Sequence, residues 1–149
     1  MHRRNLLTGT FTAAGALLAA ATSAVRAKAA DPEKSKAVYH LTDLDKVGFV
    51  LGNIRNHFDG MGGPGKVTIA LVVHGPALKA FHSVPANAEV TRRLDELSKT
   101  ALALYACGNT MKSQNITLKD LPPGFVVAEE GGVVRIAELQ AAGYAYLRP

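Results

Sequence analysis

The chain has 149 residues, of which 48% are hydrophobic, and it carries 17 Lys+Arg against 12 Asp+Glu. Four of the basic residues and none of the acidic ones lie in the first 29 positions, so the rest has 13 basic against 12 acidic residues, a net charge near +1. That balance excludes the strongly basic surface by which proteins bind nucleic acid or an anionic membrane.

The first 29 residues are predicted to be a targeting segment rather than part of the fold. Arg3-Arg4 precede a short, mildly apolar stretch rich in Ala, Gly and Thr, and Ala27-Lys28-Ala29 has the small-x-small pattern of a cleavage site. A paired arginine before a weak apolar core is typical of the twin-arginine export route. We therefore expect residues 1–29 to be a twin-arginine signal peptide and the mature protein to be periplasmic. The alternative is an uncleaved membrane anchor, for which the stretch is short.

Residues 30–149 alternate between strand and helix patterns. Val67–Val73 is a continuous apolar run, which is typical of a parallel strand buried on both faces. Apolar residues at helical spacing or at strand spacing define the other elements. In chain order we predict a strand at 36–41, a helix at 44–59, a strand at 67–73, a short helix at 77–82, a helix at 87–101, a strand at 102–106, a short helix at 111–115, a strand at 125–128, a helix at 131–140 and a strand at 144–147.

This alternation favours one α/β domain over residues 30–149, with three α/β/α layers and a mostly parallel five-stranded sheet. In such open sheets, sites form beyond the carboxyl ends of the strands. Three segments meet that condition, namely Thr42-Asp43, His74-Gly75-Pro76 and Cys107-Gly108-Asn109.

Cys107 is the one cysteine of the chain, and it follows a predicted strand. Unpaired N–H groups and the dipole of a following helix can stabilise a thiolate at such a place. The thiolate could attack a sulfur donor and hold the sulfur as a persulfide. The alternative is a small, buried and inert structural residue.

His74 ends the buried strand and could orient a ligand or act as a base toward Cys107, or it could be a satisfied strand-end histidine. No third group completes a hydrolase triad. Because there is one cysteine and His40, His57 and His82 are scattered, we expect no metal site and no cofactor. A metal- or haem-associated accessory protein using His74 and Cys107 is a weaker hypothesis.

Three stretches together resemble the DsrE/DsrF-like family of sulfur-relay proteins. They are residues 67–78 with His-Gly-Pro, residues 104–111 with Cys-Gly-Asn-Thr, and residues 131–149 with the ending Gly-Tyr-Ala-Tyr-Leu-Arg-Pro. The resemblance implies the α/β/α fold, a homotrimer or homohexamer, and a cysteine at the position of Cys107 that carries sulfur as a persulfide. Its partners would be sulfur donor and acceptor proteins or small sulfur species.

The leading hypothesis is a periplasmic sulfur-binding or sulfur-transfer protein, a carrier rather than a turnover enzyme, with Cys107 as the carrier. The alternative is a non-catalytic oligomeric module that binds a small ligand or partner, with Cys107 structural. Under either hypothesis we expect the residues around Cys107 to form the binding site; these are His74, Gly75, Gly108, Asn109 and Thr110.

Overall fold

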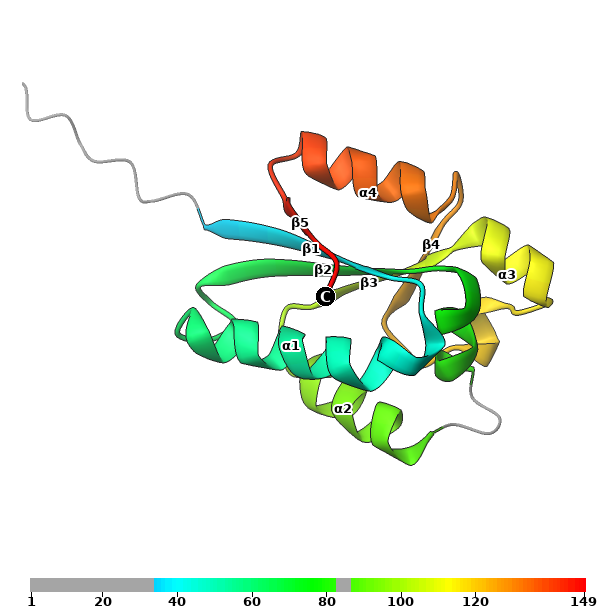
Figure 1. Cartoon of the computed structure of the whole chain (residues 1–149), viewed down its shortest axis with the longest axis horizontal. Coiled ribbons are helices and arrows are strands. Elements are labelled where there is room, and N and C mark those ends of the chain that lie inside the picture. The colour runs from blue at the N-terminus through cyan, green and yellow to red at the C-terminus, as the bar shows by residue number, and fades with distance from the viewer. Residues whose placement is uncertain (1–33, 83–86) are drawn as a thin grey trace, which may run out of the picture. The chain divides into compact units, whose positions relative to one another are not determined.

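Five parallel strands form one sheet in the computed structural model, which describes residues 34–82 and 87–149 (Figure 1). The strands are β1 (Ser35–Leu41), β2 (Val67–Val73), β3 (Ala103–Cys107), β4 (Phe125–Ala128) and β5 (Ala145–Leu147). Their order across the sheet is β4-β3-β2-β1-β5. The predicted signal peptide at residues 1–29 lies outside the described residues.

Helices cover both faces of this sheet, which confirms the predicted three-layer α/β/α class. The α-helices are α1 (Val47–Gly60), α2 (Ala88–Ser98), α3 (Gly108–Gln114) and α4 (Gly132–Ala141), and the short 3-10 helices are η1 (Leu44–Lys46), η2 (Gly75–Phe81) and η3 (Leu118–Asp120). Figure 1 shows α1 and α2 on one face, α4 on the other, and α3 beyond the carboxyl ends of the strands. No helix in the described part of the chain is both long enough and apolar enough to span a membrane.

Two helices next to the predicted site start earlier than the sequence predicts. The segment after β2 is a 3-10 helix that begins at Gly75, with a proline in its first turn, whereas the predicted short helix begins at residue 77. Helix α3 begins at Gly108, three residues before the predicted start, so Asn109 and Thr110 belong to its first turn. The backbone N–H groups of that turn therefore point back toward the end of β3.

The apolar core has two parts, one on each face of the sheet. The larger part lies between the sheet and helices α1 and α2, and includes Ile54, Phe58, Ile69, Leu71 and Leu97. The smaller part lies under α4 and consists of Val38, Ala70, Val72, Ile136 and Leu139. Because β2 is buried on both faces, its sequence is an uninterrupted apolar run.

The carboxyl ends of β1, β2 and β3 meet at one edge. Leu41 is in register with Val73, and Val73 with Ala106. Beyond the strands, the His74 N–H donates to the Leu41 carbonyl at 3.1 Å and the Ala77 N–H to the Thr42 carbonyl at 2.9 Å. The segments that follow β1 and β2, where the sequence places candidate residues, are therefore hydrogen-bonded to each other.

Candidate functional site

Cys107 is the last residue of β3 and the N-cap of α3. Its thiol is free and only 6% of the residue is exposed. The tight entry into the helix depends on Gly108, because a Cβ there would lie 3.0 Å from the carbonyl oxygen of Ala128 on β4. The glycine lets the first turn of α3 pack directly on the neighbouring strand, which holds the sulfur at the sheet edge.

Polar groups of α3 and α4 favour the ionised form of the thiol. Burial alone would raise the pKa of Cys107, but hydrogen bonds from the Thr110 hydroxyl and from the amides of Thr110, Gly132 and Asn109 outweigh it and lower that pKa. Asn109 and Thr110 lie in the first turn of α3, and Gly132 is the first residue of α4. The positive ends of two helix dipoles thus converge on one thiol and favour its thiolate.

Thr110 has a second hydrogen bond that determines the direction of the first. Its buried Oγ1 accepts the Gly75 N–H at 3.0 Å. The hydroxyl hydrogen is therefore available to donate to the sulfur of Cys107. The Gln114 side-chain amide also donates to the Gly75 carbonyl at 2.9 Å, so the segment after β2 is fastened to α3 at two points.

Gly132 brings α4 close enough to contribute its amide. A Cβ at this position would lie 3.2 Å from His74 Cδ2 and 3.3 Å from Cys107 Cβ. The side chains of His74 and Cys107 therefore flank the start of α4, and a residue with a side chain would force them apart. The sequence indicated Gly131-Gly132 as a helix start but gave no sign of this contact.

His74 contacts His40, which in turn contacts Tyr146, and neither of these two residues was among the predicted site residues. His74 Nε2 lies 2.5 Å from Nε2 of His40 on β1, and His40 Nδ1 lies 2.6 Å from the hydroxyl of Tyr146 on β5. The two imidazoles stack with their centroids 4.7 Å apart. The sequence contained a pattern that could have placed His40 near the site: His40 follows Val38 at strand spacing and so shares that residue's face of the sheet. No such pattern marks Tyr146, because its position depends on the pairing of β5 with β1.

Both histidines are neutral at neutral pH. Burial lowers the pKa of His40 to about 4, assisted by His74 in its protonated form and by Arg148, and opposed by Asp43. Burial and Arg148 also lower the pKa of His74. The guanidinium of Arg148 donates to Thr42 Oγ1 at 3.2 Å and lies 3.8 Å from the Asp43 carboxylate.

The predicted site residues are thus close together but contribute differently. Cys107, Thr110, Gly75 and His74 form a connected set, whereas Asn109 has an exposed side chain and contributes its backbone amide. Over residues 34–82 and 87–149 there is no group of three or more His, Cys, Asp or Glu placed to hold a metal ion.

The fold and site define a class: a parallel α/β domain with one buried, hydrogen-bonded cysteine where a strand enters a helix. Residues 30–149 match the model of the DsrE/DsrF-like family, and the chain belongs to that family, which is implicated in sulfur relay.

One of the solved structures that match the chain has a similar fold. It is the protein of unknown function MTH1491 from Methanobacterium thermoautotrophicum, with 26% sequence identity and a TM-score of 0.67, and the match covers 77% of this chain and 99% of that one. No curated protein sequence matches the chain.

Proposed function

We propose that this protein is an exported, periplasmic sulfur carrier that holds sulfane sulfur as a persulfide on Cys107. The observation that carries the proposal is the convergence of donors from α3 and α4 on a buried thiol, which lowers its pKa. Membership in a family implicated in sulfur relay supports it. Export is proposed from the Arg3-Arg4 leader.

The transfer step needs no oxidant beyond the donor itself. The Cys107 thiolate attacks a sulfur of a polysulfide, and its electron pair forms the new S–S bond. The old S–S bond breaks, and its electron pair leaves on the rest of the donor, which becomes a shorter polysulfide or hydrosulfide anion. Because the thiol is nearly buried, we expect a small sulfur species rather than a protein-bound persulfide to be the donor.

Intact mass spectrometry of protein recovered from the periplasm tests the proposal. The mass should first correspond to residues 30–149. After exposure to polysulfide it should rise by about 32 Da for each sulfur atom, and reductant should reverse the gain. The matched control is Cys107→Ser, which should gain nothing. Full uptake of sulfur by Cys107→Ser would overturn the assignment of Cys107 as the carrier.

A second candidate function is a non-catalytic binding module in which Cys107 is structural. It is favoured by the 6% exposure of Cys107 and by an open groove of about 510 Å³ beside α3, lined by Gly108, Met111, Lys112, Thr117, Val127 and Glu129. The two functions differ in thiol chemistry. A folded protein that resists both alkylation and polysulfide would favour the module, whereas a carrier must react with both.

A further inference from the structure

The histidine pair has a geometry that a sulfur carrier does not require. We propose that His40 and His74 together bind one late first-row divalent metal ion, of which Zn²⁺ is the redox-inert example, through their Nε2 atoms. This site is separate from the persulfide proposal and does not depend on it.

The two proposed ligand atoms, one Nε2 from each histidine, already lie close together. The Nε2 atoms of His40 and His74 face each other at 2.5 Å, at the ends of neighbouring parallel strands. Imidazole binds zinc with Zn–N bonds of about 2.0 Å, so a tetrahedral ion would hold the two nitrogens roughly 3.3 Å apart. A chelating arrangement therefore needs the two nitrogens to separate by roughly 1 Å and the rings to turn so that both lone pairs point at one ion.

A hydrogen-bond partner on Nδ1, the other ring nitrogen of His40, orients this imidazole. The hydroxyl of Tyr146 lies 2.6 Å from His40 Nδ1, on the side of the ring away from His74. When Nδ1–H donates to that oxygen, Nε2 keeps its lone pair and points at His74. Metal-binding histidines are commonly oriented by a partner of this kind on the other ring nitrogen.

Two charged groups lie near the pair. The nearby positive charge of Arg148 opposes a cation, but Asp43 lies 3.8 Å from that guanidinium and partly compensates it. Two protein ligands leave the other coordination positions for water or an external anion, so we expect weaker and more exchangeable binding than at a four-ligand structural site.

The chain contains a matched control for this pair. His57 Nδ1 lies 3.0 Å from the hydroxyl of Tyr39, so it too is a histidine held by a tyrosine. Among the described contacts of His57, no second imidazole nitrogen faces it. If a tyrosine-held histidine were enough to bind metal, His57 would contribute equally.

The test is calorimetric titration of untagged mature protein with Zn²⁺ in a Cys107→Ser background, which removes the thiol as a competing ligand. We expect one equivalent to bind, with Kd at least about tenfold higher in His40→Gln and in His74→Gln and unchanged in His57→Gln. Tyr146→Phe should weaken binding by about tenfold because His40 is no longer oriented. Circular dichroism would show that each variant is folded.

Three results would overturn the proposal. They are the absence of Zn²⁺ binding to the Cys107→Ser protein, equal loss on changing His57, and full binding in folded His40→Gln and His74→Gln. If Zn²⁺ binding requires the thiol, the two-histidine site is also wrong. None of these results affects the mass test for the persulfide, which depends on Cys107 alone.

Discussion

A single hydroxyl, that of Thr110, joins the two strand ends that form the site. It accepts from Gly75 and donates to Cys107, so we expect its removal to raise the pKa of the thiol. In Thr110→Val the thiolate fraction at neutral pH should fall, and alkylation of Cys107 should slow about three- to tenfold. The rates should converge at alkaline pH, above the pKa of both proteins, because both thiols are then ionised. The pH dependence of the alkylation rate measures this.

Thr110→Ser is the control for that prediction, since it keeps the hydroxyl. The valine variant also leaves the Gly75 N–H without its acceptor, which should lower the free energy of unfolding by about 1–3 kcal/mol. Rates are therefore compared under conditions where both variants are folded. An unchanged pH profile in Thr110→Val would show that the hydroxyl does not stabilise the thiolate.

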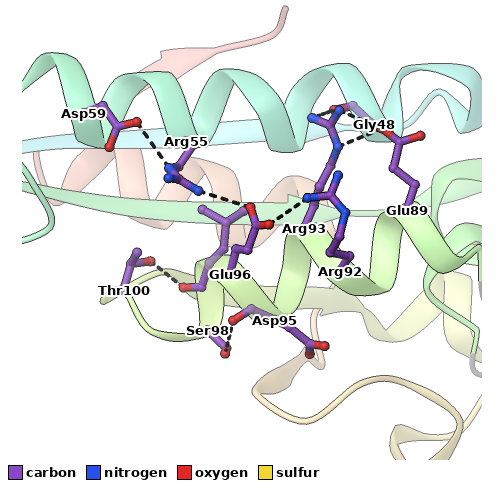
Figure 2. A network of polar contacts seen from close by, with 11 residues as sticks. Gly48, Arg55, Asp59, Glu89, Arg92, Arg93, Asp95, Glu96, Ser98 and Thr100 are labelled. Atoms are coloured by element: carbon purple, nitrogen blue, oxygen red, sulfur yellow. Dashed lines mark hydrogen bonds and ion pairs between the residues drawn. The ribbon is translucent and has the colours of Figure 1, made fainter.

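At the scale of elements, α2 is attached to the rest of the domain in two ways. Glu96 on α2 accepts from Arg92 at 2.7 Å and from Arg55 on α1 at 3.1 Å, and Arg93 reaches the Gly48 carbonyl at 3.1 Å (Figure 2). The side chains of the Glu96 pairs are 40–60% exposed, so solvent screens them. The opposite face of α2 is buried against the core through Val90, Leu94 and Leu97.

We therefore expect the apolar face to dominate the attachment of α2. Glu96→Gln should lower the free energy of unfolding by less than about 1 kcal/mol. The neighbouring change Leu97→Ala, at a residue that is 2% exposed, should lower it by about 2–5 kcal/mol because it leaves a cavity. Urea unfolding of both variants measures the difference. Equal losses would mean that the ion pairs hold the helix.

The two faces of the whole molecule are covered unequally. Helices α1 and α2 cover one face of the sheet, whereas α4 alone covers the other. On the α4 side, apolar residues are exposed, among them Val133 at 67%, Val126 at 54% and Tyr146 at 42%. An interface with another copy of the chain would remove these side chains from water. This exposure supports a proposal of self-association through the α4 side.

We expect the mature protein to be a homotrimer or homohexamer in solution. Light scattering after gel filtration should give three or six times the protomer mass, and Val133→Glu should shift the protein toward the monomer with its secondary structure unchanged. The exposed Phe49→Glu change on α1 is the control, since that helix is on the other face. A wild-type monomer at micromolar concentration would contradict the prediction.

The fold could be predicted because each element has a local signal. The uninterrupted apolar run of β2 indicated a strand buried on both faces, and apolar spacing indicated α1 and α2. Gly143, which has a positive φ just after α4, is a glycine of the kind that typically ends a helix. Such signals need only a few neighbouring residues.

The histidine pair and its tyrosine could not be predicted in the same way. His40 and Tyr146 are separated by 106 positions, and their contact exists because β5 pairs with β1 at the far side of the sheet from β4. Strand order is a property of tertiary packing, and a three-residue strand carries little information about its neighbour. The amide of Gly132 was missed for a similar reason, since its distance to Cys107 is set by how α4 lies on the sheet.

The pairing of β5 with β1 also determines when the site can first exist during synthesis. A ribosome translates β5 after every other element of the domain, yet Tyr146 belongs to this strand and Arg148 follows it closely. A nascent chain can bury β2 and orient Cys107 earlier, but its two histidines then lack their tyrosine. The complete cluster therefore forms only after β5 has emerged from the ribosome, so any ligand that needs all of its members binds after the rest of the domain has emerged.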